Sequence, residues 1–228
     1  MRGMHPQHET ESANPLMLRG KGSGGLMTTL HQMQISGNCY KARLAAHQLG
    51  QNLTLIDYPV WGGKTRTPEF LAKNPNGRVP LLELEDGRML AESGAILFWL
   101  AEGSALFPDD RWTRAKILQW MFFEQYSHEP YIAVARFWLA HAPQEEMDKR
   151  RHLVSEWHER GNAALAVMET HLSRHEWFAG DAYSIADIAL YAYTHCAGEG
   201  GFELSRYPAV SAWLGRVAAR PAYIAMDA

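Results

Sequence analysis

The sequence has little of what would mark a secreted, membrane or nucleic-acid-binding protein. It contains only two cysteines, Cys39 and Cys196, and neither has metal-ligand spacing around it, which favours a reducing compartment. No stretch approaches the roughly twenty apolar residues of a membrane span, and the first residues lack the layout of a signal peptide. The formal charge of −3 gives no basic field for nucleic acid. We therefore expect a cytoplasmic protein with a small-molecule or protein partner, and neither a membrane nor a nucleic-acid partner.

What the sequence does contain is enough apolar material for a large core. Of the 228 residues, 46% are hydrophobic, which suits one large or two small domains. Residues 1–26 are polar and end in a Gly-rich run, so they predict a disordered tail. Residues 105–111 carry Pro108 and two aspartates and predict a linker. The predicted domains are thus 27–104 and 112–228.

The first predicted domain combines strands and helices. A strand, a helix of about a dozen residues and a second strand indicate a right-handed parallel βαβ unit. Asp86-Gly87 is a two-residue hairpin signal, which adds an antiparallel edge. We expect an α/β domain with a mixed four-stranded sheet, its strands at 30–35, 53–58, 79–84 and 89–91 and its helices at 38–49, 68–72 and 92–103.

The second predicted domain is all-helical, because no segment after residue 111 alternates with a period of two. Pro130 is expected to kink or split the first of its helices. Ser184 to Asp187 has the form of a capping box, and we interpret Asp187 as a folding residue. The expected helices are 112–140, 144–171, 184–196 and 208–219.

One junction between strand and helix combines three chemically useful side chains. Ser36, Asn38 and Cys39 bring a hydroxyl, an amide and a thiol to the predicted start of the first helix. The first-turn N–H groups of a helix are unpaired, and its dipole places partial positive charge there. The junction therefore suits an anion such as a thiolate. Simple helix capping by Ser36 and Asn38 is the alternative.

Four motifs in order resemble the glutathione S-transferase superfamily over residues 27–228. They are Ser-Gly-Asn-Cys-Tyr-Lys-Ala-Arg-Leu at 36–44, Asn-Pro-Asn-Gly-Arg-Val-Pro-Leu-Leu at 74–82, Glu-Ser at 92–93, and Ala-Gly-Asp with Ser-Ile-Ala-Asp at 179–187. The resemblance implies a thioredoxin-like domain followed by an all-helical domain, glutathione as co-substrate without a metal, a small hydrophobic electrophile as second substrate, and a homodimer.

The resemblance also implies roles for residues that hold glutathione. Val79 precedes a proline, Pro80, that is cis in the family, and its backbone pairs with the cysteinyl unit of glutathione; Arg78 belongs to the same motif. Glu92 and Ser93 would hold the ammonium and the carboxylate of the γ-glutamyl unit. The alternatives are an ordinary strand beginning with a proline and a plain helix start.

Further site residues are expected on a loop and on a long helix. Lys64 or Arg66 would hold the glycyl carboxylate, although solvated loop charges are the alternative. Tyr126 and Tyr131 would line the electrophile pocket, although aromatic residues at helical spacing are more often core.

The residue facing the sulfur decides the chemistry, and three candidates stay open. Ser36 matches the serine-type pattern of the superfamily, Asn38 is a second donor, and Cys39 resembles the glutathione-contacting cysteine of beta-class members without a C-x-x-C partner. We therefore consider three hypotheses. They are a transferase that adds glutathione to electrophiles, a glutathione-dependent disulfide or hydroperoxide reductase, and a non-catalytic binding protein.

Overall fold

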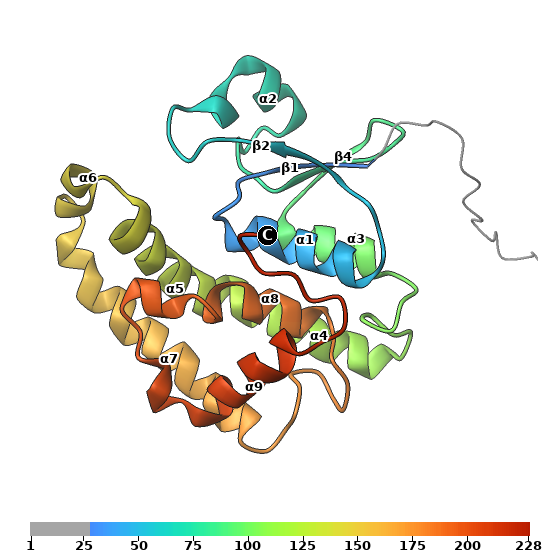
Figure 1. Cartoon of the computed structure of the whole chain (residues 1–228), viewed down its shortest axis with the longest axis vertical. Helices are drawn as coiled ribbons and strands as arrows, with labels where there is room; N and C mark the ends of the chain where they lie inside the picture. The colour runs from blue at the N-terminus through green and yellow to red at the C-terminus, as the bar shows by residue number, and fades with distance from the viewer. Residues whose placement is uncertain (1–27) are drawn as a thin grey trace, which may run out of the picture.

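The computed structural model describes residues 28–228, and the predicted tail at 1–26 lies outside them. The described chain forms a sheet-containing half followed by a helical half (Figure 1). The elements of the first half are β1 (Thr29–Gln32), α1 (Gly37–Gln48), β2 (Thr54–Asp57), a 3₁₀ turn (Lys64–Arg66), α2 (Pro68–Lys73), β3 (Leu81–Glu83), β4 (Met89–Ala91) and α3 (Ser93–Ala101).

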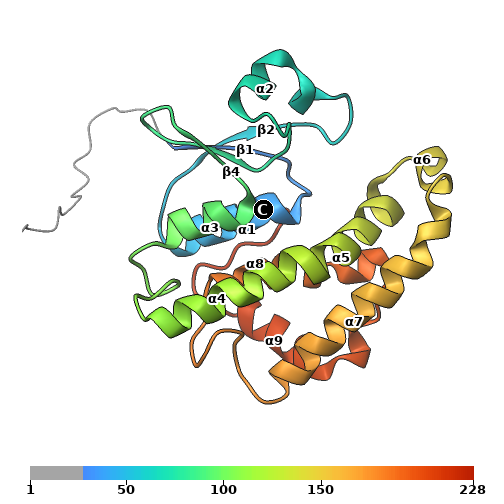
Figure 2. The same ribbon diagram turned by 180° about the vertical axis from the view of Figure 1, so that it is seen from behind.

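The four strands form one mixed sheet in the order β2-β1-β3-β4. β1 is parallel to β2 and antiparallel to β3, and β4 closes the predicted hairpin against β3. Helices α1 and α3 lie side by side on one face of the sheet, and α2 lies on the other, as the views from both sides show (Figures 1 and 2). This confirms the predicted thioredoxin-like arrangement.

The helical half contains the elements α4 (Arg111–Phe123), a π-helical turn (Glu124–His128), α5 (Glu129–Arg136), a second π-helical turn (Phe137–His141), α6 (Gln144–Asp148), α7 (Val154–Leu172), α8 (Ile185–Thr194) and α9 (Pro208–Ala218). A π turn holds one residue more per turn than an α-helix, so it rotates the following side chains around the axis. The π turn at Glu124–His128 comes just before Pro130, at the place where the sequence predicted a kink.

One predicted helix is wrong. The segment 144–171 is split into α6 and α7 by a 3₁₀ turn at Arg151–Leu153. Between the buried Met147 and the partly buried Leu153 the chain is Asp-Lys-Arg-Arg-His. No apolar side chain in that stretch anchors a straight helix to the core, so the chain turns there.

Helix α8 is the centre of the molecule, with all of its residues buried, and it contacts α1, α3, α4, α5 and α9. Its start shows the predicted capping box, in which the carboxylate of Asp187 accepts from the backbone N–H of Ser184. The last residues return to the first domain, where the Tyr40 hydroxyl donates to the carbonyl of Ile224 at 2.6 Å. None of the helices in residues 28–228 has the length and apolar character needed to cross a membrane.

Candidate functional site

A small hollow opens where the two halves of the chain meet. It has a volume of about 100 Å³ and is bounded by the start of α1, the turn before β3, the start of α3 and the first residues after α4. Six of the residues predicted from sequence line it together, although they come from separate segments. Its lining consists of Asn38, Asn74, Asn76, Arg78, Val79, Pro80, Glu92, Ser93, Gln125 and Glu129.

The turn before β3 is held by its own asparagine. The Asn74 side chain donates to the carbonyl of Arg78 at 2.8 Å and accepts from the backbone N–H of Asn76 at 3.1 Å. The peptide bond between Val79 and Pro80 is cis, as the resemblance implies. The turn thus presents Val79 and Pro80 to the hollow while the Arg78 side chain is exposed.

The start of α3 forms the opposite wall. Glu92 has a φ of 70°, a left-handed conformation that residues other than glycine adopt at an energetic cost. Such strained residues concentrate at functional sites. The unpaired backbone amides of the first helical turn, beside the buried Ser93, provide hydrogen-bond donors for an anion, and Glu92 is exposed next to them.

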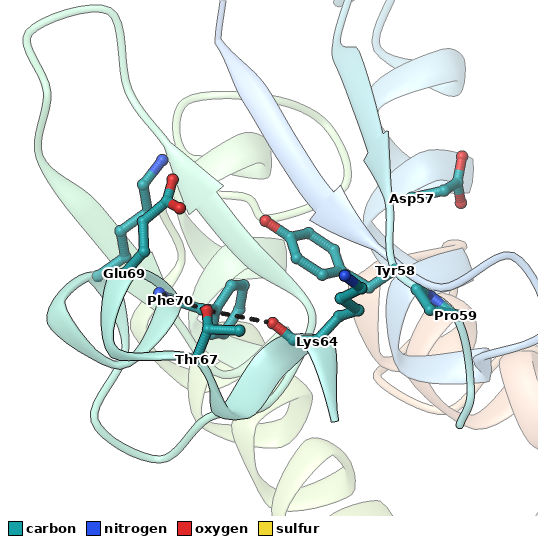
Figure 3. A pocket seen from close by; sticks show the side chains of 8 residues that line it. Asp57, Tyr58, Pro59, Lys64, Thr67, Glu69 and Phe70 are labelled. Atoms are coloured by element: carbon teal, nitrogen blue, oxygen red, sulfur yellow. Dashed lines mark hydrogen bonds between the residues drawn. The ribbon is translucent and has the colours of Figure 1, made fainter. Parts of the chain in front are cut away.

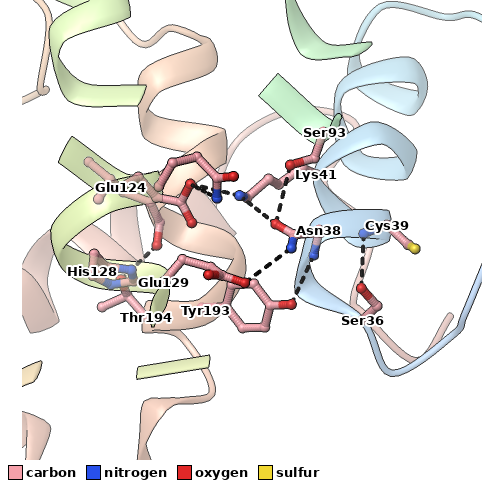
Figure 4. A network of polar contacts seen from close by, with 12 residues as sticks. Ser36, Asn38, Cys39, Lys41, Ser93, Glu124, His128, Glu129, Tyr193 and Thr194 are labelled. Carbon is pink, nitrogen blue, oxygen red and sulfur yellow. Dashed lines mark hydrogen bonds and ion pairs between the residues drawn. The ribbon is translucent and has the colours of Figure 1, made fainter. Parts of the chain in front are cut away.

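Asn38 is the centre of a polar network at the start of α1 (Figure 4). Its Oδ1 accepts from the Lys41 ammonium at 2.8 Å and from the Ser93 hydroxyl at 3.2 Å. Its Nδ2 donates to Oε1 of Glu129 at 3.3 Å, and its backbone N–H donates to the Tyr193 hydroxyl at 3.3 Å. The network therefore fixes the Asn38 side chain at the edge of the hollow.

Behind Asn38 lies an ion pair in the interior. Lys41 Nζ is 2.8 Å from Oε2 of Glu124, and both side chains are only 1% exposed. Burial raises the pKa of Glu124, and the neighbouring Lys41 opposes that rise. One turn further along the helix, Nε2 of His128 forms a hydrogen bond of 2.9 Å with the Thr194 hydroxyl. Burial lowers the pKa of His128 to about 3, so its imidazole is neutral.

Ser36 and Cys39 do not line the hollow. The Ser36 hydroxyl accepts from the backbone N–H of Cys39 at 3.3 Å, which makes Ser36 the N-cap of α1. Cys39 is 0% exposed, and its Sγ points to the opposite side of α1 from Asn38 (Figure 4). Burial raises the pKa of the Cys39 thiol to about 11. A buried thiol of this kind does not suit the contact with glutathione that the resemblance implies for Cys39.

Lys64 and Arg66, the two predicted loop cations, do not line the hollow. Lys64 lines a separate hollow of about 340 Å³ with Asp57, Tyr58 and Phe70 (Figure 3). The Arg66 guanidinium donates to the carbonyl of Asn76 at 2.8 Å. Arg66 thus braces the turn that borders the candidate site, without lining the site itself.

Tyr126 and Tyr131 lie apart from the hollow as well. Tyr126 is 84% exposed, and both tyrosines line a different depression of about 290 Å³ against α7. The physical reason is the spacing of these residues along the helix. Glu124 and His128 are four residues apart and share the buried face, so Tyr126, midway between them, points to the opposite, exposed side.

Several residues that line the hollow were not predicted as site residues from the sequence. Asn74 and Asn76 belong to the motif at 74–82 but carry no chemical signal of their own, and Gln125 and Glu129 lie in and directly after the π turn. Lys41 had one signal, its position three residues after Asn38 on the same helical face. Within residues 28–228, no group of three or more histidine, cysteine, aspartate or glutamate side chains is arranged to hold a metal ion.

The fold and the hollow at the domain junction define a two-domain protein of thioredoxin-like plus helical class. Two family models match it. They are the glutathione S-transferase N-terminal domain over residues 30–106 and the glutathione S-transferase C-terminal domain over residues 119–221. The chain belongs to the glutathione S-transferase family.

Individual relatives agree with that assignment. The chain is 33% identical to the glutathione S-transferase-like protein LUC7 of a Fusarium species, over 81% of this chain and 85% of the relative. It is 30% identical to the disulfide-bond oxidoreductase YfcG of Escherichia coli, over 81% of this chain and 87% of the relative.

Solved structures show the same fold. A glutathione S-transferase from Pseudomonas fluorescens is 51% identical with a TM-score of 0.85, over 88% of this chain and 99% of that chain. A structure of Ure2p in complex with glutathione is 26% identical with a TM-score of 0.75, over 88% and 94%. Glutathione is thus a ligand within this family.

Proposed function

We propose that this protein is a glutathione transferase that binds glutathione as a thiolate and adds it to small electrophilic substrates. One observation carries the proposal. The side chain of Asn38, the cis Val79–Pro80 turn and the Glu92–Ser93 helix start, which lie far apart in sequence, line a single hollow.

The charges around the hollow match the ends of glutathione. Glu92 and Glu129 supply two carboxylates for the γ-glutamyl ammonium. The first backbone amides of α3, beside the Ser93 hydroxyl that donates to Asn38, supply donors for the γ-glutamyl carboxylate. A volume of about 100 Å³ suits this head group, and the rest of the tripeptide then extends along Val79. Arg66, beside the same turn, is the nearer of the two loop cations for the glycyl carboxylate.

The thiol then faces the Asn38 amide. A free thiol has a pKa of about 8.5, and an N–H donor favours its thiolate form. The thiolate attacks the electrophilic carbon, a C–S bond forms, and the leaving group departs with its electron pair. The protein contributes positioning and a lowered thiol pKa. In this proposal Ser36 is a helix cap and Cys39 is a core residue.

The test compares wild type with Asn38→Ala. Conjugation of glutathione to an aryl halide should fall about a hundredfold in kcat/KM, the usual cost of one oxyanion-type donor. The pKa of bound glutathione, followed by ultraviolet absorbance of the thiolate, should rise toward that of the free thiol. Asn52→Ala, at an exposed position, is the control. Equal rates for wild type and Asn38→Ala would remove Asn38 from its role.

A second candidate function is reduction of glutathione-containing disulfides. Two observations favour it. The residue that α1 contributes to the hollow, Asn38, carries an amide rather than a hydroxyl, and one relative is named as a disulfide-bond oxidoreductase. Turnover of a mixed disulfide of glutathione by the wild type, without turnover of the aryl halide, would select it. The third candidate is a non-catalytic binding protein, which absence of a thermal shift with millimolar glutathione would favour.

We also propose that the protein works as a homodimer in the cytoplasm. An apolar hollow of about 480 Å³ lies between α3 and α4, and Phe122 on its edge is 69% exposed. Large exposed aromatic side chains of this kind commonly mark an interface. A monomeric sedimentation coefficient at micromolar concentration would contradict the dimer. Two free cysteines suit a reducing compartment, which fractionation of the source cells would test.

A further inference from the structure

The buried ion pair behind Asn38 joins the two domains at one point. Lys41 belongs to α1 of the first domain, and Glu124 opens the π turn of the second. Their contact at 2.8 Å spans 83 positions of sequence. Burying two charges is costly, and an apolar pair of similar volume is often as stable. The pair is therefore poorly explained by stability alone.

The contacts of Lys41 assign the orientation of the Asn38 amide. An ammonium group can only donate hydrogen bonds, so the Asn38 atom 2.8 Å from Lys41 Nζ must be the oxygen. The Ser93 hydroxyl donates to that same oxygen at 3.2 Å. With the oxygen turned to Lys41 and Ser93, the NH₂ group must face the other way, toward Glu129 and the hollow.

Glu124 in turn fixes Lys41. Its Oε2 accepts from Lys41 at 2.8 Å and from the Gln125 amide at 3.2 Å. Its Oε1 is buried and has no hydrogen-bond partner among the described residues, so the carboxylate is only half satisfied by its surroundings. An unpaired buried oxygen lowers the stability of the folded protein. The contact that Glu124 makes with Lys41 is what offsets this loss.

We propose that Lys41, held by its counter-ion Glu124, is a positioning residue that keeps the NH₂ group of Asn38 directed at the sulfur of glutathione. The inference rests on the proposed function, since it assigns a task to Asn38 that only a bound thiolate uses. Without Lys41, the Asn38 amide loses its strongest restraint and turns to present its oxygen as readily as its nitrogen. An oxygen facing the sulfur would disfavour the thiolate.

The first test uses the double variant Lys41→Met/Glu124→Met, which leaves no unpaired charge in the interior and so protects folding. We expect the pKa of bound glutathione to rise by about one unit, and kcat/KM below that pKa to fall about tenfold, a tenfold change in thiolate for each pH unit. The exposed pair Lys149–Glu146 provides the control as Lys149→Met/Glu146→Gln, which should leave both quantities unchanged. An unshifted thiol pKa in the double variant would overturn the proposal.

The second test asks whether Lys41 acts through Asn38. In an Asn38→Ala background, Lys41→Met/Glu124→Met should cause no further rise in the thiol pKa, because no amide remains to be oriented. A rise of the same size in that background would show that the charge of Lys41 acts directly on the thiolate, and would overturn the positioning role.

A third measurement separates this inference from the proposed function. In the ligand-free protein, the hydrogen bond to Glu129 should shift one Asn38 Nδ2 proton away from its position in a free amide, and the double variant should move that resonance back toward the free position. Wild-type protein that fails to bind glutathione contradicts the proposed function. Unchanged Asn38 resonances in the double variant contradict the positioning role, whatever the protein binds.

Discussion

Helices α1 and α8 begin in the same way and end up in different roles. Each starts at a serine N-cap, where Ser36 Oγ accepts from the N–H of Cys39 at 3.3 Å and Ser184 Oγ accepts from the N–H of Ala186 at 3.3 Å. The difference is the third helical residue, which is Cys39 in α1 and Asp187 in α8. A carboxylate at that position occupies the N-terminus of the helix with the protein's own negative charge, which we call a closed start. Without it, the unpaired N–H groups of the first turn stay available to a ligand.

The start of α8 is closed by its own side chain. The Asp187 carboxylate accepts four hydrogen bonds, two from Ser184 and one each from the Phe178 backbone and the Trp213 indole. Burial raises the pKa of Asp187 to about 6, so it is ionised at neutral pH. In α1 the first turn has no acidic residue, and Asn38 turns toward the hollow instead. The same cap can therefore serve stability or binding, depending on one neighbour.

Breaking the closed start should have the largest effect. In Asp187→Asn, an NH₂ group replaces one carboxylate oxygen and faces N–H groups that can only donate. The hydrogen bonds to a charged acceptor are lost, which should lower the free energy of unfolding by about 3 kcal/mol. This corresponds to a fall in Tm of about 6 to 12 °C for a chain of this size. Calorimetry at pH 7.5 measures it, with the exposed Asp181→Asn as control. A variant that keeps its Tm and loses glutathione binding would place α8 in the site.

The reactivity of the two thiols tests whether Cys39, the third residue of α1, is a reactive group. Burial raises the pKa of Cys39 and of Cys196 to about 11, so less thiolate exists at any pH below that value. At pH 8 the thiolate fraction should be about a hundredfold below that of a free cysteine, and it should rise tenfold per pH unit up to pH 11. Labelling of the native protein with a thiol reagent should be correspondingly slow, and fast after unfolding. Rapid labelling of Cys39 at pH 8 would return it to the list of reactive residues.

Removing the two serine N-caps should have the smallest effect, and the loss of stability should be similar for α1 and α8. Ser36→Ala and Ser184→Ala each lose a capping bond worth about 1 kcal/mol. Urea unfolding of both variants measures this loss. We expect kcat/KM of Ser36→Ala to stay within about threefold of wild type, since Asn38 remains. A hundredfold loss would instead identify Ser36 as the donor to the sulfur.

The elements and the family motifs could be read from the sequence because their signals are local. The capping box, the Asp86-Gly87 hairpin and the turn before Pro80 each depend on a few consecutive residues. The choice among Ser36, Asn38 and Cys39 could not be made that way. Successive helical residues point about 100° apart, and which of them meets the hollow depends on where the rest of the chain lies.

The remaining differences depend on contacts between distant segments. Glu124 continues the buried face that Ile117 and Met121 form on α4, but its contact with Lys41 depends on how the helical half packs against α1. Tyr126 lies two positions after Glu124 and faces solvent on the other side of the helix. Pairing between distant segments thus sets the limit of what the sequence alone predicts at this site.

The return of the final segment to α1 has a consequence for how the protein is made. Tyr40 and Arg43 donate to the carbonyls of Ile224 and Met226, and Arg43 also donates to the carbonyl of Gln34, just before the α1 cap. Helix α1 therefore obtains the partners at Ile224 and Met226 from a segment that is synthesised after α9. During translation, the neighbourhood of α1 stays incomplete until that segment has emerged from the ribosome.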